Sequence, residues 1–119
     1  MIVSDHPLLF DGLRGACART SDAEIVGESL DVTQAVRDFT RAKPDVVIVD
    51  LQLLLARLVI RLLRGLSSRI PIVALTTQSR RLVVRHSERN PPIQVSKSSP
   101  TEAIVDAARA AVLGGKKTP

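Results

Sequence analysis

The stretch from Val46 to Asp50 constrains the fold of this 119-residue chain more than any other. Four consecutive β-branched apolar residues follow the turn pair Pro44-Asp45 and run directly into an aspartate. Such a run predicts a strand that is buried on both faces, as in the middle of a parallel sheet. Ligands of open α/β sheets bind at the carboxyl ends of the strands, so Asp50 is a candidate site residue. An aspartate at such a junction can also simply cap the next helix.

Strand and helix patterns alternate along the rest of the chain. Runs of β-branched apolar residues predict strands at 1–3, 24–28, 46–50, 70–75 and 93–96. Apolar residues at helical spacing, with caps and prolines at their ends, predict helices at 7–19, 32–43, 53–66, 80–89 and 100–113, of which the fourth is short and weakly patterned. This alternation predicts an α/β fold with a five-stranded parallel sheet of flavodoxin-like order 2-1-3-4-5 and helices on both faces.

The composition fits one domain. With 45% hydrophobic residues the chain can bury a single core, so we expect a folded domain at 1–115 and a flexible tail at 116–119. The lone Cys17 and the absence of a signal-peptide pattern indicate a reducing cytoplasm. The longest apolar run, 53–63, is interrupted by two arginines and is too short to span a bilayer. No membrane association is therefore expected.

The charges are unevenly distributed. Residues 1–50 carry nine acids and five bases, whereas residues 51–101 carry nine bases and one acid. Such asymmetry is typical of a surface for nucleic acid, anionic lipid or an acidic protein. Arginines scattered along helices are also common on an ordinary solvated surface. Because aromatic residues make up only 2% of the chain, a base-stacking nucleic-acid module is disfavoured.

Four residues with useful chemistry stand at or just past the ends of four predicted strands: Asp5, Asp50, Thr76 and Lys97. In a sheet of order 2-1-3-4-5 these four strands are neighbours, so the side chains are expected to converge on one crevice. Two close carboxylates favour a cation such as Mg²⁺ between them. A carboxylate there could attack a phosphoryl group, whose oxygens the ammonium and hydroxyl groups would hold.

The order and spacing of five segments resemble the receiver domain of two-component response regulators, a CheY-like family, and most closely the subgroup that is joined to a LuxR-type helix-turn-helix. The segments are Ser4-Asp5-His6-Pro7-Leu8, Ile25-Val26-Gly27-Glu28, the run from Lys43 to Leu51, Ala74-Leu75-Thr76 and Lys97-Ser98-Ser99-Pro100. The resemblance covers essentially the whole chain.

The resemblance implies a role for each residue of the constellation. Asp50 would accept the phosphoryl group, and Asp5 and the backbone carbonyl of Gln52 would join it in binding Mg²⁺. Thr76 would be the switch hydroxyl and Lys97 the partner of the phosphate. The implied partners are a sensor histidine kinase or another phosphodonor, and an output protein or DNA-binding module outside this chain. A homodimer is a further possibility that the apolar segment 53–66 suggests.

Three positions depart from the family pattern. Ser4-Asp5 stands where members usually carry two acids, so the metal site lacks one carboxylate. Leu53-Leu54-Leu55-Ala56 replaces the usual Met-Pro-Gly-like turn, and Gln94 replaces the usual aromatic switch residue. These departures leave open an atypical receiver, which signals through protein contact or ligand binding without phosphorylation.

Two further classes are alternatives. A basic nucleic-acid-binding regulator would use the arginines of the second half, although the chain shows no groove-reading pair of helices. A phosphatase would need a second general base beside Asp50, for which His6 is the one candidate, and a histidine after a strand is more often a helix-start residue. We therefore expect a signalling domain and no enzyme.

Overall fold

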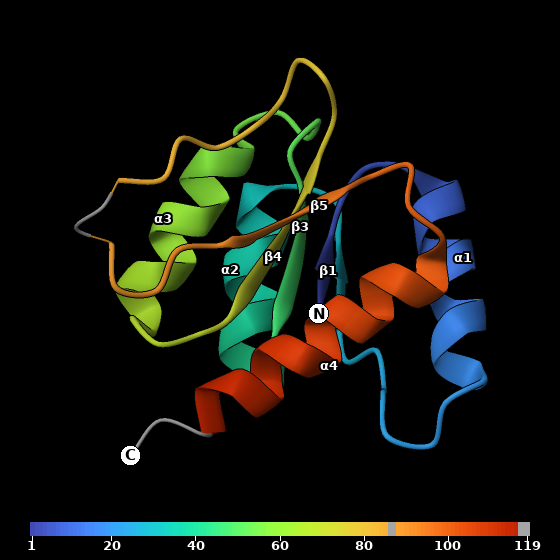
Figure 1. The fold of residues 1–119 in the computed structure, drawn as a ribbon. Helices are drawn as coiled ribbons and strands as arrows, with labels where there is room; N and C mark the ends of the chain where they lie inside the picture. Colours follow the sequence, from blue (N-terminus) through green and yellow to red (C-terminus); the bar gives the residue numbers. More distant parts are fainter. Residues whose placement is uncertain (86–87, 117–119) are drawn as a thin grey trace.

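The computed structural model describes residues 1–85 and 88–116, with side chains as far as residue 114 (Figure 1). One parallel sheet has the order β2-β1-β3-β4-β5, as the sequence predicts. Its strands are β1 (Ile2–Val3), β2 (Glu28–Ser29), β3 (Val47–Asp50), β4 (Ile72–Thr76) and β5 (Ile93–Ser96). The helices of the described residues are α1 (Pro7–Ala18), α2 (Val32–Ala42), α3 (Ala56–Leu66) and α4 (Thr101–Lys116).

Strand β3 lies in the middle of the sheet and is buried on both faces. Val47 and Val49 are completely buried in the core formed with α2 and α3, while Ile48 belongs to the core formed with α1 and α4. Alternate side chains of a strand point to opposite faces, so consecutive apolar residues supply both cores. Burial of each such side chain contributes about 1.5–3 kcal/mol. Helices therefore cover both faces, as predicted (Figure 1).

The cap predicted at the start of α2 is present in the structure. Asp31 Oδ1 accepts a hydrogen bond of 2.8 Å from the backbone N–H of Gln34, and Gln34 Oε1 accepts one of 3.0 Å from the N–H of Leu30. These bonds satisfy backbone donors at the start of α2. Helix α4 begins just after Pro100, continues past its predicted end at residue 113, and ends at Lys116. Residues 117–119 of the predicted tail lie outside the described part of the chain.

The second strand is shorter than predicted. The sequence indicates a strand at 24–28, but the structure pairs only Glu28 and Ser29 with β1. Strand β1 itself has just two residues, and the backbone N–H of Ile2 donates to the carbonyl of Gly27. Ile25 and Val26 thus have the composition of a strand. However, β1 is too short to offer them a backbone to pair with.

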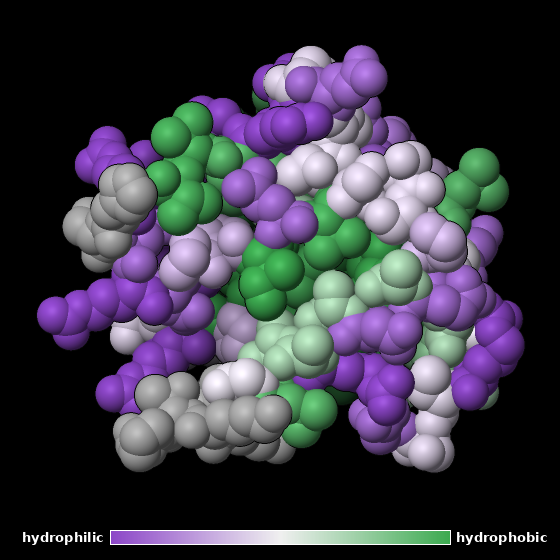
Figure 2. All heavy atoms as spheres, in the orientation of Figure 1, coloured by the Kyte–Doolittle hydropathy of each residue, from purple (hydrophilic) through white to green (hydrophobic). Residues whose placement is uncertain are grey.

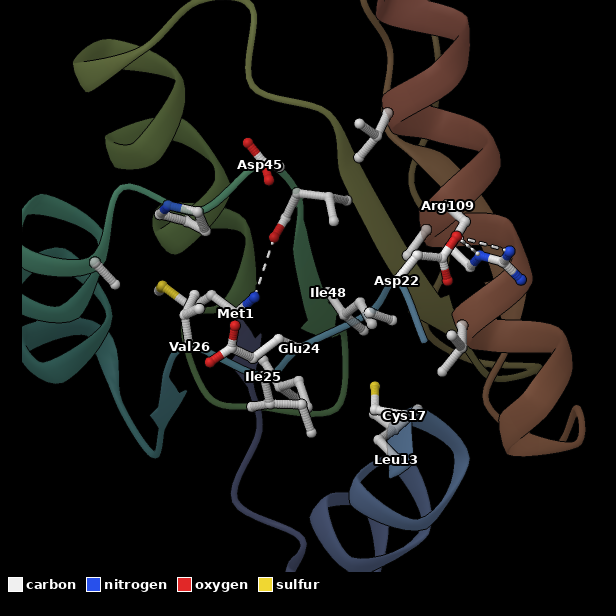
Figure 3. A pocket seen from close by; sticks show the side chains of 18 of the residues that line it. Met1, Leu13, Cys17, Asp22, Glu24, Ile25, Val26, Asp45, Ile48 and Arg109 are labelled. Carbon is white, nitrogen blue, oxygen red and sulfur yellow. Dashed lines mark hydrogen bonds and ion pairs between the residues drawn. The ribbon is translucent and has the colours of Figure 1, made fainter. Parts of the chain in front are cut away.

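The extended segment 22–26 instead borders a cavity of about 380 Å³ at the amino-terminal end of the sheet (Figure 3). Leu13 and Cys17 of α1 and Ile48 of β3 line it. At its side, Arg109 Nη2 donates to Asp22 Oδ2 over 2.9 Å. Burial raises the pKa of the Cys17 thiol above its usual value.

The fourth predicted helix, at 80–89, is wrong: the described residues between β4 and β5 contain no helix, and residues 86–87 lie outside the description. Leu82 packs against the core on the α2 and α3 side. The side chain of Gln94 accepts from Leu82 N–H at 2.9 Å and donates to Leu82 C=O at 3.0 Å. One apolar anchor and two hydrogen bonds thus hold an extended segment, because the local sequence offers no apolar stripe for a helix to bury.

As a result, β5 is a thinly covered edge strand. Ile93 is 42% exposed, and Val95 is only half-buried. Figure 2 shows apolar side chains gathered in the middle of the face on which β5 and α4 lie, with hydrophilic side chains around them. Edge strands of this kind are available for contact with other chains.

Candidate functional site

Asp50 is completely buried at the carboxyl end of β3. Its Oδ2 accepts a hydrogen bond of 2.7 Å from Ser4 Oγ and lies 2.8 Å from Lys97 Nζ. Its Oδ1 accepts a hydrogen bond of 3.0 Å from the backbone N–H of Gln52. A buried carboxylate is stable only when it is hydrogen-bonded and neutralised, and these three donors meet both needs.

Lys97 reaches Asp50 from the end of β5, on the far side of β4 in the sheet. It follows β5 directly, and its backbone N–H donates to the carbonyl of Thr76 over 2.8 Å. Its ammonium also donates to Gln52 Oε1 at 2.6 Å and contacts His6 Nδ1. The Lys97 ammonium is therefore held by three side chains, those of Asp50, Gln52 and His6. It is only 16% exposed.

Ser4 and His6 take part in the site in ways that the sequence did not indicate. Ser4 is fully buried at the end of β1, where it supplies Asp50 with a hydrogen bond but no charge. Its hydroxyl also accepts from the backbone N–H of His6 at 3.1 Å. His6 Nδ1 lies 3.6 Å from Asp50 Oδ2. Their position after a strand end, beside Asp5, and the family pattern, in which an acid usually stands at the position of Ser4, are the sequence signals for their place.

Fewer carboxylates are available to bind a divalent cation than the family pattern implies. Asp5, His6 and Asp50 each offer a ligand atom within 4.8 Å of the others. The carboxylates of Asp5 and Asp50 suit a hard cation that keeps several waters. However, Lys97 already neutralises Asp50, and Ser4 adds no charge. The residues fit a divalent cation, but one that competes with an ammonium group for the same oxygen.

Thr76 and Gln94 are not drawn into the contacts around Asp50. Thr76 ends β4, and its hydroxyl donates a long hydrogen bond of 3.4 Å to the carbonyl of Val95. Gln94 is committed to the backbone of Leu82. The structure thus brings Asp5, Asp50 and Lys97 of the predicted constellation together, and leaves Thr76 beside them at the next strand end.

Comparisons with known proteins agree on the fold. A crystal structure of a LuxR-family two-component response regulator from Aurantimonas sp. SI85-9A1 matches with a TM-score of 0.77 and 26% identity, over 96% of this chain and 84% of that one. The solution structure of the receiver domain of PhyR from Erythrobacter litoralis matches with a TM-score of 0.75 over 99% of this chain and 92% of that one. Its identity is 22%, so this likeness concerns the fold alone.

Sequence comparison adds a shorter match. The sensory transduction protein LytT of Bacillus anthracis is 38% identical over 53 residues, which are 44% of this chain and 22% of the length of that protein. No protein-family model matches the chain. Within the described residues no helix combines the length and the apolar character that a bilayer crossing requires.

The sheet order, the carboxylate at the end of its central strand and the likeness to solved response regulators define a receiver domain. Among receiver domains, it is similar to those of LuxR-type regulators, as the segments quoted from the sequence indicated. The LuxR-family regulator that it resembles is a protein of two-component signalling.

Proposed function

We propose that this receiver domain accepts a phosphoryl group on Asp50 and thereby changes its affinity for a protein partner. The observation that carries the proposal is the pairing of a fully buried carboxylate with Lys97, whose ammonium lies 2.8 Å from Asp50 Oδ2. Purely structural aspartates at strand ends usually cap a helix or turn near the surface. Asp50 Oδ1 does accept a turn hydrogen bond from the N–H of Gln52, but the side chain is completely buried, and its other oxygen lies beside a lysine from a different strand end.

The reaction would be an in-line phosphoryl transfer. A carboxylate oxygen of Asp50 attacks phosphorus, the new O–P bond forms, and the bond from phosphorus to the donor's leaving group breaks with its electron pair. Lys97 would then pair with a phosphoryl oxygen in place of the carboxylate, and Thr76 would donate its hydroxyl to another. A divalent cation at Asp5, Asp50 and the carbonyl of Gln52 would neutralise charge on the phosphoryl oxygens.

The closed arrangement over Asp50 implies that phosphorylation begins with a movement of side chains. Because Asp50 has no exposed surface, Lys97 and Gln52 must separate before a phosphodonor can reach the carboxylate. That movement exchanges one hydrogen bond for contacts with the incoming phosphoryl group. The movement links modification of Asp50 to the loop that follows β3, on which Gln52 lies.

In this function the phosphodonor would be a sensor histidine kinase or a small phosphodonor. The output would be a separate protein or a DNA-binding module attached to the domain. The usual coupling of the switch hydroxyl to an aromatic residue is not open to this chain, because Gln94 occupies the aromatic position. The signal would instead pass through Gln94 to the segment that it holds at Leu82.

The second candidate is an atypical receiver that signals by protein contact without phosphorylation. It is favoured by the Ser4–Asp50 hydrogen bond, which fills the place where a further metal-binding carboxylate is expected and ties the acceptor oxygen into the core. In this case Lys97 and Asp50 would form a permanent ion pair that stabilises the surface to which the partner protein binds.

Intact-protein mass spectrometry separates the two candidates. The protein is incubated with Mg²⁺ and a small phosphodonor such as acetyl phosphate, with Asp50→Asn as control. The proposed function predicts a mass gain of one phosphoryl group in the wild type and none in Asp50→Asn. No mass gain in either protein on incubation with the phosphodonor would support the atypical receiver.

A further inference from the structure

A groove with a cavity of about 350 Å³ lies beside the loop that follows Asp50. One wall is the turn into α3, and the other is the segment 79–81 that follows β4; the two lie beside each other at the top of Figure 1. Arg57 Nη2 donates to the carbonyl of Arg81 over 3.1 Å and so joins the walls. The volume is within the range of ligand and peptide pockets, and the groove is open to solvent.

The groove is cationic. Arg57, Arg80 and Arg81 line it, all three are exposed, and none of them forms an ion pair with a carboxylate in the part of the chain that the structure describes. Glu88 is the single acid between residues 51 and 101, and its carboxylate accepts from the backbone of Arg85. Three guanidinium groups without a counterion attract an anionic partner over roughly a Debye length, about 8–10 Å.

The floor of the groove is apolar. Leu51 and Leu53 are buried beneath it, Leu58 is half-buried, and Leu55 remains 55% exposed at its edge. A phosphate backbone gains nothing from contact with such leucines, and the described residues that line the groove include no aromatic side chain on which a base could stack. A partner that fits this groove needs carboxylates to pair with the arginines and aliphatic side chains to cover the leucines. A protein segment can carry both kinds of group.

We propose that this groove binds an acidic segment of a partner protein that also carries leucine-like side chains. The guanidinium groups hold the carboxylates and the leucine floor buries the aliphatic groups. The groove also borders the acceptor site, because Leu51 follows Asp50 directly and Leu53 N–H donates to the carbonyl of Asp50 over 3.0 Å. It is therefore placed to respond to phosphorylation, which rests on the proposed function, although binding itself requires no phosphate.

A fluorescein-labelled peptide rich in aspartate and leucine, titrated with the unphosphorylated protein at low salt, tests the proposal by fluorescence anisotropy. Wild type is expected to bind this peptide and to lose affinity when its aspartates are replaced by lysine or its leucines by serine. The triple variant Arg57→Gln/Arg80→Gln/Arg81→Gln should bind at least about tenfold more weakly. The matched variant Arg37→Gln/Arg41→Gln/Arg69→Gln, with the same loss of charge outside the groove, should bind as wild type does.

Amide NMR of the wild type tests the same proposal without relying on the folding of a variant. The peptide should shift the amide signals of residues 51–58 and 79–82 most. Equal affinity in both triple variants, shifts elsewhere, or no binding at low salt would overturn the proposal. So would duplex DNA that displaces the peptide from these residues, which would make the groove a nucleic-acid surface. None of these results depends on Asp50. The proposal for the groove can therefore be contradicted while phosphorylation of Asp50 is confirmed, and phosphorylation can be contradicted while peptide binding is confirmed.

Discussion

Ser4 Oγ donates a hydrogen bond of 2.7 Å to Asp50 Oδ2, and both side chains are completely buried. The bond joins the ends of two neighbouring strands, β1 and β3, at the point where a receiver domain usually holds an additional metal-binding acid. A neutral hydroxyl there removes a source of charge repulsion around Asp50 and replaces it with a stabilising contact. The site is therefore built to be stable without a bound cation.

Replacing the Ser4 hydroxyl should show how much it stabilises the site in the absence of a cation. Ser4→Ala removes a donor from a buried carboxylate and should lower the free energy of unfolding by about 1–3 kcal/mol in chelator. Ser4→Asp should be destabilised by a similar amount in chelator because two carboxylates repel, and Mg²⁺ should restore much of the loss through binding to the folded state. Urea unfolding with and without Mg²⁺ measures both effects. An Mg²⁺ response in Ser4→Asp no larger than in wild type would contradict this role for Ser4.

The contact between Gln52 and Lys97 should control access to Asp50. Gln52→Ala removes the 2.6 Å hydrogen bond from Lys97 Nζ and leaves the lysine freer to move. The rate of Asp50 modification by a small phosphodonor should rise by about two- to tenfold, the kinetic equivalent of one hydrogen bond. Initial rates from intact mass are the measurement, with Leu54→Ala as control, since Leu54 is 80% exposed nearby. An unchanged or slower rate in Gln52→Ala would exclude this gating.

Gln94 should hold the segment after β4 in place. Gln94→Ala removes both hydrogen bonds to the backbone of Leu82. Amide exchange at Leu82 should become about tenfold faster, because local opening loses roughly one hydrogen bond of net stability. Gln78→Ala alters an exposed side chain of the same segment and should leave exchange at Leu82 unchanged. Equal protection of Leu82 in all three proteins would show that the core contact of its side chain alone suffices.

The strand that organises this molecule could be predicted from local sequence, because four β-branched residues in a row suit a strand with two buried faces. The convergence of Asp50 and Lys97 followed from strand order and chain position. The described residues of the segment 80–89 form no helix: arginines at helical spacing leave no apolar stripe, and the contacts that fix this segment, from Leu82 and Gln94, are tertiary. Likewise the contacts of Ser4 and Gln52 with the site depend on side-chain direction, which spacing alone does not give.

Leu55 provides a local test of the turn that borders the groove. It adopts a left-handed conformation, with φ 63° and ψ 27°, immediately before α3, where it is also 55% exposed. A leucine in this region costs about 1–2 kcal/mol relative to ordinary backbone, and glycine avoids the cost. Leu55→Gly should therefore stabilise the protein by about 1 kcal/mol.

Leu54→Gly is the matched control for that change. Leu54 has no positive φ, so glycine there should lower stability by about 0.5–1 kcal/mol through added freedom of the unfolded chain. Urea unfolding of both variants gives the comparison. The same sign for the two changes would show that the turn is not strained at Leu55.

The amide NMR spectrum recorded with Mg²⁺ and beryllofluoride, a mimic of a carboxylate-bound phosphoryl group, tests phosphoryl acceptance at Asp50 most directly. We expect the signals of Gln52, Thr76 and Lys97 to shift in the wild type and to stay unchanged in Asp50→Asn. Such shifts would show that the buried carboxylate opens to a phosphoryl-like ligand and that its neighbours respond. A wild-type spectrum that does not change, in a protein that remains folded, would contradict phosphoryl acceptance and leave Asp50 and Lys97 as a structural ion pair.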